Sequence, residues 1–352
     1  MRPFWILLMV IALVAGCASD GATEQTYLSS RQAAEEIEAL QNDVVGIGNG
    51  LMNGVVGSAL AGFPYAPSDG PVFVGSPSLA LGILHADGYG QPRRLATGSY
   101  ALDPITYRWT YAAAPADRLI VRWAAETATG SAMELDILWA AGSATTLVTD
   151  WDGANFHLPT RAHLVLRQDG AAIVDVIVEQ GVRSTACGAI AEATLLRVNG
   201  TAGNTAAGVT VRDLAFRATS PTSFSVTGGI AARSGSLTLG LDLDVRMRLG
   251  IFRSPETCFP QLESLEAVEA TLGITRASKD VTVAFEAVAP QVVGSGASLS
   301  LRAGRVVIAG GRFDFAGTID GATALDEALM LTFAAGEVMK LRQFLERYGL
   351  GN

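Results

Sequence analysis

The sequence predicts a mainly β protein built around one large antiparallel sheet, with an N-terminal helix and a short C-terminal helix packed on it. Three observations lead to this fold class. Apolar and polar residues alternate without a break over residues 237–249, shorter alternating runs recur between residues 100 and 320, and helical apolar spacing is confined to the two ends of the chain. Alternation with a period of two is typical of strands with one buried face and one face in water. A curved sheet, a sandwich and a roll all satisfy this pattern.

The first 16 residues are expected to be a signal peptide. After a positive start, residues 4–13 are uniformly apolar, and this run is too short to cross a membrane as a helix. Val14, Ala15, Gly16 and Cys17 then resemble the lipobox of bacterial lipoproteins, although Val14 stands where Leu is commonest. The resemblance implies cleavage between Gly16 and Cys17 and acylation of Cys17, on its sulfur and on the new amine. The alternative is an ordinary signal peptide followed by a chance cysteine.

Acylation of this kind would hold the protein on a membrane. Each buried methylene contributes about 0.8 kcal/mol, so two or more acyl chains anchor stably where a single chain binds reversibly. Ala18, rather than Asp, follows the cysteine, and by resemblance to lipoproteins of diderm bacteria this favours the outer membrane. We therefore expect a lipoprotein of the bacterial cell envelope, tethered to its membrane through residues 17–28.

A Gly-rich helix is expected over residues 29–62. Ser29 and Gln32 fit a capping box, and apolar residues then recur at helical spacing as far as Leu51. If the helix continues to residue 60 it is about 45 Å long, which matches the length of a strand over residues 237–249. A helix laid along the apolar face of a long sheet satisfies both elements.

Small residues recur at every fourth position in the second half of this helix. Gly46, Gly50 and Gly54 belong to the series, and such a ribbon lets another backbone approach closely. Each glycine costs about 1 kcal/mol in a helix interior, which weighs against a helix as far as residue 60. We expect close packing on the sheet; the alternative is membrane insertion or helix-mediated assembly.

The β domain is expected over residues 63–352, with a candidate subdivision near residues 152–161. All four tryptophans of the mature chain precede residue 152, and neither Trp nor Tyr recurs until residue 348. We expect the tryptophans in the core, because an aromatic side chain buries a large apolar area. Binding of a sugar or a lipid is the alternative role for them.

Turn and helix signals divide the β domain further. Asp169 with Gly170, and Asn199 with Gly200, each predict a hairpin turn between two strands. Helical spacing returns over residues 336–348, and Gly349 is a suitable stop for that helix.

Two cysteines remain besides Cys17. In an exported chain, Cys187 and Cys258 are expected to form a disulfide. It would close a loop of about 70 residues and contribute at most about 4.4 kcal/mol by chain entropy. Two buried thiols are the alternative.

No motif for catalysis, a metal or a cofactor is found, so we expect no catalytic residue, no metal and no cofactor. The histidines, His85, His157 and His163, do not form a ligand set, and residues 149–159 lack the order of a calcium loop. Asp242 and Asp244 invite comparison with a glycosidase pair, but neighbouring arginines favour a solvated, charge-balanced strand face.

The composition limits the classes of partner. The net charge is −9, only 17% of the residues are charged, and there is no basic run, so we expect no nucleic-acid partner. The expected function is a non-enzymatic binding or scaffolding role, with an acyl chain or an envelope protein as partner. The apolar side of a concave sheet would hold the acyl chain. The alternative is a lipid-anchored enzyme with a site built from loops such as residues 150–157.

Overall fold

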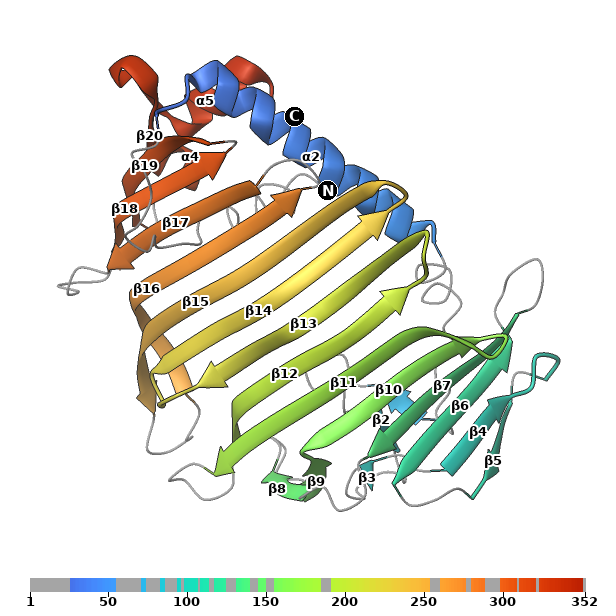
Figure 1. Ribbon diagram of the computed structural model, residues 1–352. Coiled ribbons are helices and arrows are strands. Elements are labelled where there is room, and N and C mark those ends of the chain that lie inside the picture. The colour runs from blue at the N-terminus through green and yellow to red at the C-terminus, as the bar shows by residue number, and fades with distance from the viewer. Residues whose placement is uncertain are drawn as a thin grey trace. The chain divides into compact units, whose positions relative to one another are not determined.

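The computed structural model is mainly β, with one large sheet, an N-terminal helix and a short C-terminal helix, as the sequence predicts (Figure 1). The structure describes residues 26–54, 71–73, 83–85, 94–95, 98–106, 108–113, 117–124, 131–139, 145–149, 155–184, 191–253, 260–276, 280–288, 298–308, 310–320 and 323–350. The chain divides into two compact units. Unit 1 comprises residues 1–47, 217–231 and 236–352, and unit 2 comprises residues 48–216 and 232–235.

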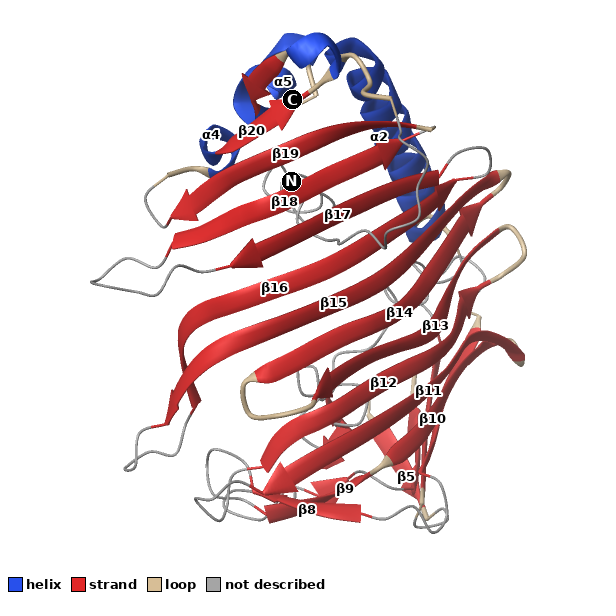
Figure 2. Cartoon of the chain, turned by 60° about the vertical axis from the view of Figure 1, so that its left-hand side comes forward, coloured by secondary structure: helices blue, strands red, loops and turns tan. Residues whose placement is uncertain are grey.

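Sixteen strands belong to the large sheet. In unit 1 the hydrogen-bonded order is β21-β20-β19-β18-β17-β16-β15-β14, and Figure 2 shows the long members of this series side by side. These strands are β14 (Ser223–Ser234), β15 (Leu237–Arg253), β16 (Pro260–Arg276), β17 (Asp280–Val288), β18 (Ser298–Ile308), β19 (Gly311–Asp320), β20 (Leu329–Thr332) and β21 (Val338–Lys340). Helices α2 (Ser30–Met52), α4 (Leu325–Ala328) and α5 (Leu341–Tyr348) and the 3-10 turn η2 (Ala334–Gly336) complete the series.

In unit 2 the order is β13-β12-β11-β10-β7-β6-β4-β5. The strands are β4 (Gly98–Leu102), β5 (Trp109–Ala112), β6 (Arg118–Ala124), β7 (Ala132–Trp139), β10 (Arg161–Gln168), β11 (Ala171–Ser184), β12 (Ala191–Gly203) and β13 (Ala207–Ala218). Strands β4 and β6 pair in parallel, which departs from a purely antiparallel sheet. Two small sheets are formed by β1 (Pro71–Phe73), β2 (Ile83–His85) and β3 (Arg94–Leu95), and by β8 (Thr145–Thr149) and β9 (Asn155–Pro159).

Strand β15 contains the alternating stretch from which the sheet was predicted. Its odd-numbered residues Leu239, Leu241, Leu243 and Val245 pack against the core of unit 1, whereas Asp242, Arg246 and Arg248 on the other face are exposed. β15 pairs with β16 over its length, with two register shifts. The period-two pattern therefore identified both the strand and its buried face.

Helix α2 packs on this apolar face within unit 1, as predicted. Ile37 and Leu40 contact the same core as the apolar residues of β15, and Ile47 is buried. A Cβ added at Gly46 would lie 2.8 Å from Leu237 Cδ1. The helix ends at Met52, however, and a turn follows at Asn53. The expected continuous helix to residue 60 is therefore interrupted at Asn53, directly before Gly54, a residue type that is costly in a helix interior; residues 55–60 lie outside the described residues.

The C-terminal region differs from its prediction over residues 336–340. Val338–Lys340 form β21, which pairs with β20, and α5 begins only at Leu341. The chain turns back between the two strands through Ala335 and Gly336, both at positive φ, a conformation incompatible with a helix there. The helix ends with Gly349 at its C-cap, as predicted.

The core of unit 2 contains the aromatic residues of its strands. Trp123 and Trp139 are buried and Trp109 packs against the same cluster, which confirms their core position; Trp151 lies outside the described residues. The predicted hairpin at Gly170 is present, with positive φ at both turn residues.

The second predicted hairpin, at Asn199 and Gly200, is wrong. Both residues continue strand β12, and Asn199 Oδ1 accepts a hydrogen bond of 2.6 Å from the backbone N–H of Asp213. The chain turns instead after Gly203, where Asn204 Oδ1 accepts from the N–H of Ala207. The Asn199 side chain thus hydrogen-bonds to the neighbouring strand β13, and the turn lies a few residues after the predicted position.

Gly50 provides a test of the close helix packing. A Cβ added at Gly50 would lie 2.6 Å from Ser234 Cβ, whereas one at Gly48 would meet nothing within 4 Å. We expect Gly50→Leu to lose about 1–3 kcal/mol of unfolding free energy through overpacking. The matched control, Gly48→Leu, is expected to gain up to about 1 kcal/mol, because Leu is the better helix former. Thermal or urea unfolding measures both, and a stabilised Gly50→Leu would contradict the packing.

Candidate functional site

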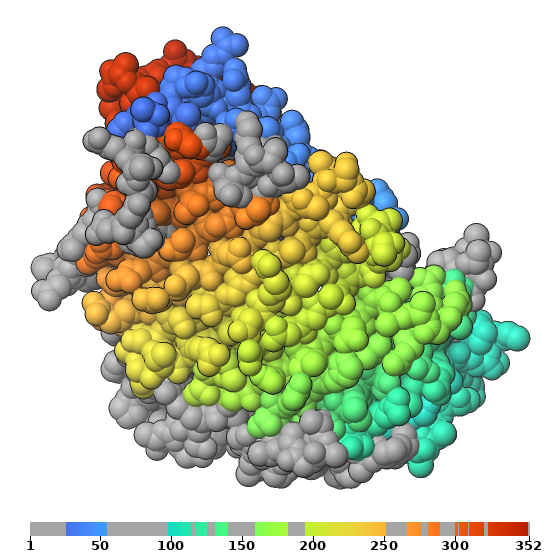
Figure 3. Space-filling model, viewed as in Figure 1, coloured from blue at the N-terminus to red at the C-terminus, as the bar shows by residue number. Residues whose placement is uncertain are grey.

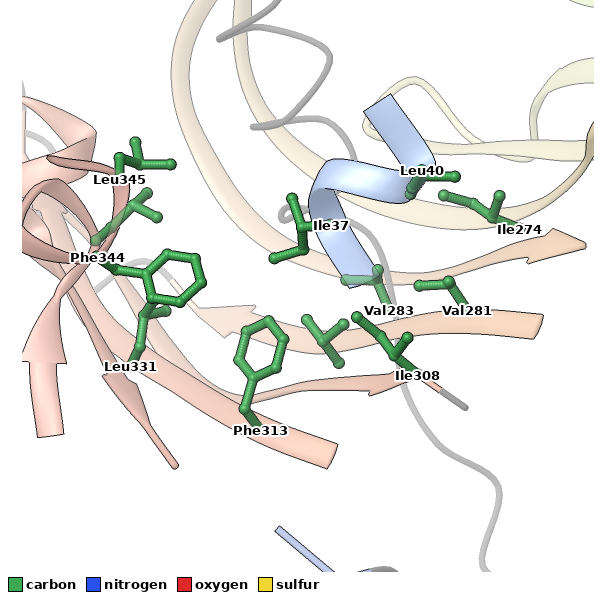
Figure 4. A pocket seen from close by; sticks show the side chains of 12 residues that line it. Ile37, Leu40, Ile274, Val281, Val283, Ile308, Phe313, Leu331, Phe344 and Leu345 are labelled. Carbon is green, nitrogen blue, oxygen red and sulfur yellow. The ribbon is translucent and has the colours of Figure 1, made fainter. Parts of the chain in front are cut away.

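Unit 1 contains an apolar cavity of about 70 Å³ between α2, α5 and the sheet. Figure 4 shows the lining side chains, which come from α2 on one side and from the strands and α5 on the others. All of them are aliphatic or aromatic: Ile37, Leu40, Ile274, Val281, Val283, Val306, Ile308, Phe313, Leu331, Leu341, Phe344 and Leu345.

Cross-strand neighbours form the floor of the cavity. Ile274 pairs with Val281 and Val281 pairs with Ile308, so three adjacent strands, β16, β17 and β18, present these side chains in one row. Phe313 from β19 continues the floor. Beyond it, the ring of Phe333 lies 5.3 Å from the rings of Phe313 and Phe344. β-Branched and aromatic residues on one strand face pack into such a continuous apolar surface.

Helix α2 is fixed to unit 1 on both sides of the cavity. At its start, Ser30 Oγ donates to Glu337 Oε2 at 2.6 Å and lies 2.7 Å from the hydroxyl of Tyr348. Further along, Gly46 approaches Leu237. Ile37 and Leu40 lie between these two contacts and are only partly buried. The helix therefore spans the cavity as a cover that is held on both sides of it.

The hydrogen bond from Ser30 also lowers the pKa of Glu337. This hydrogen bond, with a further contribution from Arg347, outweighs desolvation and holds the pKa of Glu337 below its usual value. The Glu337 carboxylate is therefore ionised at neutral pH and is a strong acceptor for the Ser30 hydroxyl.

The C-terminus reinforces the cover. Gln41 Nε2 donates to the carbonyl of Leu350 at 3.5 Å, and α2 and the C-terminal residues lie side by side in the space-filling view (Figure 3). Because the lining carries no polar atom, the cavity can neither orient a substrate by hydrogen bonds nor move a proton. The lining offers water no hydrogen-bond partner, so the cavity favours apolar groups over water.

Most of the site residues predicted from sequence are not described by the structure. Gly16, Cys17, Cys187 and Cys258 lie outside the described residues, so the lipidation, the cleavage and the disulfide stay predictions. Residues 150–154 of the candidate loop and the side chains of His85 and His157 also fall outside what the structure describes, whereas the backbone of residues 155–157 begins strand β9. His163 Nε2 lies 2.7 Å from Asp175 Oδ1 on an exposed strand face.

Asp244 of β15 is paired with a neighbouring arginine. Arg246 Nη2 donates to Asp244 Oδ2 at 3.2 Å, and Arg248 is paired with Glu266 at 2.9 Å. These contacts fit the charge-balanced face that the sequence predicts for Asp242 and its neighbours. Within the part of the chain that the structure describes, no three His, Cys, Asp or Glu side chains gather as a metal site. No helix in that part is both long and apolar enough to span a membrane.

A second cluster of charged side chains lies in unit 2, around the buried Asp136 of β7. Arg118 donates to both oxygens of Asp136, at 2.8 and 2.6 Å, and Arg167 donates to Oδ2 at 3.3 Å. Glu134 is paired with Arg122 and with Arg167. Both carboxylates have arginine partners, so the cluster joins β6, β7 and β10 through charge-assisted hydrogen bonds.

The sequence predicts the apolar faces of the two helices that line the cavity. It does not predict that these faces line the same cavity. Leu341, Phe344 and Leu345 were part of the predicted C-terminal helix, and Ile37 and Leu40 were part of the predicted N-terminal one. Their helical spacing is the only local signal. That the two ends of the chain lie against each other is a property of the sheet order, which no local pattern contains.

Comparison of the chain with known protein families, with curated proteins and with solved structures gave no match.

The pKa of Asp136 predicts how unit 2 responds to acid. Burial raises this pKa, but the hydrogen bonds and charges of Arg118 and then Arg167 outweigh burial, so the pKa lies below its usual value. The ionised carboxylate therefore contributes stability above about pH 4, and this contribution is lost as the pH falls through the lowered pKa.

We expect Asp136→Asn to lose about 2–3 kcal/mol of unfolding free energy at pH 7, less than for a fully buried pair because Arg118 is partly exposed. The variant should also lack the part of acid sensitivity that Asp136 supplies below about pH 4. Urea unfolding followed by Trp fluorescence measures both effects. The control is Asp175→Asn, whose carboxylate is half exposed, with an expected loss below about 1 kcal/mol. Equal losses in the two variants would contradict the structural role of Asp136.

Proposed function

We propose that the protein is a non-enzymatic lipoprotein of the bacterial cell envelope, anchored through acyl chains on Cys17, that binds the hydrocarbon chain of a lipid in the cavity of unit 1. The single observation that supports binding is a cavity whose lining side chains are all aliphatic or aromatic. The Val14 to Cys17 motif supports the anchor. In a diderm organism, Ala18 favours the outer membrane.

The volume of the cavity limits the size of the ligand segment that it can enclose. At about 70 Å³ it is far smaller than the roughly 300–1,000 Å³ of sites that enclose drug-sized ligands. An apolar cavity of about 150 Å³ accommodates benzene, so about half that volume matches a hydrocarbon segment of two or three carbons. It therefore takes the end of a chain. Ile37 and Leu40 line the cavity from α2, so a longer segment would require these two side chains to shift.

The gain from binding is apolar. Each methylene that leaves water contributes about 0.8 kcal/mol, so a two- or three-carbon segment contributes roughly 2 kcal/mol before more of the chain enters. Filling the cavity also restores the van der Waals contacts that its wall residues lack.

The anchor predicts the behaviour of Cys17→Ala. This substitution removes the acylated thiol and leaves Ala15 and Gly16 followed by an alanine, which fits the small-residue cleavage site of an ordinary signal peptide. We expect wild-type protein in the membrane fraction, resistant to high salt, and Cys17→Ala in the soluble extracytoplasmic fraction. Cys17→Ala that stays with membranes after a high-salt wash would contradict a lipid anchor.

The cavity predicts binding of a fatty-acid probe. Soluble Cys17→Ala protein is expected to enhance the emission of a fluorescent fatty acid, and the same protein carrying Leu40→Trp should lose this binding by tenfold or more because the indole occupies the cavity. Val45→Trp is the matched control, since Val45 lies on the same helix with its side chain exposed. Val283→Phe fills the cavity from the sheet in case Leu40→Trp disturbs the helix. Equal binding by all these proteins would rule out the cavity as the site.

A further inference from the structure

We propose that the outer edge of β5 in unit 2 pairs with the same edge of a second copy of this chain, antiparallel and about a two-fold axis through Thr110. The proposal is independent of the cavity in unit 1. Three observations carry it: the backbone groups of β5 that point away from the sheet, the lack of protecting residues on this edge, and the symmetry of its outward groups about Thr110.

Strand β5 is the last strand of the large sheet in unit 2, beside β4 in Figure 1. It pairs with β4 on one side, with Thr110 opposite Ala101. Among the strands that the structure describes, none pairs with its other side. Such an edge presents a row of backbone donors and acceptors that fits another strand.

Two residues of β5 direct their backbone groups to the open side. The Asp103 N–H donates to the carbonyl of Arg108 at 2.9 Å, so these residues form a hydrogen-bonded pair of the β4–β5 ladder. Hydrogen-bonded and non-hydrogen-bonded pairs alternate along an antiparallel ladder. The backbone of Thr110 therefore also faces β4, whereas the N–H and C=O groups of Trp109 and Tyr111 point away from it.

The hairpin holds this edge in a fixed conformation. Asp103 Oδ1 accepts hydrogen bonds from the N–H groups of Ile105 and Thr106, at 2.8 and 3.1 Å, and closes the turn between β4 and β5. A strand that is already formed and bonded on one side loses little conformational freedom when another strand joins it.

The β5 edge is poorly protected against pairing. Charged residues and proline commonly block edge strands, and residues 109–112 include neither. Tyr111 is 63% exposed, although its ring lies 5.2 Å from that of Tyr100. The other terminal strand, β21 in unit 1, carries Lys340, which is paired with Glu327, and leads directly into α5. Of the two terminal strands, β5 is thus the one suited to pairing.

The outward groups of β5 are self-complementary. A two-fold axis through Thr110 places Trp109 of each copy opposite Tyr111 of the other. Each of these two pairs exchanges two N–H to C=O hydrogen bonds, so the pairing uses every outward backbone group of the two residues in both copies. An axis through Trp109 or Tyr111 would pair only one residue of β5 in this way.

The side chains agree with this register. On the apolar face, Trp109 of each copy lies beside the exposed Tyr111 of the other, and cross-strand aromatic pairs favour association. A second copy also fits better than a single extended peptide, because its own edge is equally open and one contact satisfies both edges. The contact involves four residues from each copy, so we expect a reversible dimer of the small, transient class.

The test traps the dimer through a disulfide in full-length protein. Across a non-hydrogen-bonded pair the two Cα atoms are about 4.5 Å apart, which a disulfide can span. Thr110→Cys should therefore give a covalent dimer under mild oxidation. The matched control is Ala112→Cys, which is exposed on the same face but lies about 14 Å from its counterpart in this register. Both variants also carry Cys17→Ala, so that neither acylation nor that thiol contributes.

We expect at least tenfold more dimer from Thr110→Cys than from Ala112→Cys, with peptide mass spectrometry placing the bond between the two copies of residue 110. Adding Tyr111→Pro should lower the yield at least tenfold, because proline removes an outward N–H and leaves the bonds to β4 in place. Circular dichroism checks that the sheet persists in this variant.

Sedimentation velocity gives a readout without an added cysteine. The weight-average mass of Cys17→Ala protein should rise with concentration, and that of the same protein with Tyr111→Pro should rise less. Equal dimer yields from Thr110→Cys and Ala112→Cys, or no dimer from Thr110→Cys, would overturn the proposal. A Cys17→Ala protein that stays monomeric at every concentration, or a yield that Tyr111→Pro leaves unchanged, would overturn it as well.

Discussion

The structure of unit 1 depends on the contact between α2 and the apolar face of its sheet. A strand such as β15, with a continuous apolar face, needs a cover, and α2 supplies Ile37, Leu40 and Ile47 for it. The cover is held by different means at different points: a hydrogen-bonded Ser30 at its start, and Gly46 where the helix meets Leu237. Between them the contact is incomplete, and the cavity is the space that remains.

An incomplete contact of this kind costs stability, because wall atoms without neighbours lose dispersion contacts. Under the proposed function, this loss of stability is the consequence of keeping a binding site for hydrocarbon. In that function the space between α2 and the sheet is the binding site, and the side chains of Ile37 and Leu40 cover it. The charged groups around Asp136 in unit 2 are arranged differently, because they are paired across neighbouring strands and stabilise the sheet.

Local patterns predicted the elements whose environment is local. The alternation in β15 indicated the strand and its buried face, and the Asp169 and Gly170 turn was placed correctly because two adjacent positive-φ residues suffice for it. Predictions failed where a neighbouring strand decided the outcome. Asn199 hydrogen-bonds to β13 instead of turning the chain, and residues 338–340 pair with β20 although their spacing suits a helix. The cavity could not be predicted for the same reason, since its wall joins residues from both ends of the chain.

If the cavity of unit 1 holds hydrocarbon, a lipid should accompany the protein through purification. The most direct measurement is organic extraction and mass spectrometry of soluble Cys17→Ala protein purified without detergent from the cells that produce it, beside the same protein carrying Leu40→Trp. We expect an acyl lipid in the extract of the Cys17→Ala protein and no acyl lipid in the extract of the protein that also carries Leu40→Trp. Extracts free of lipid from both proteins, or equal amounts of lipid from both, would contradict it.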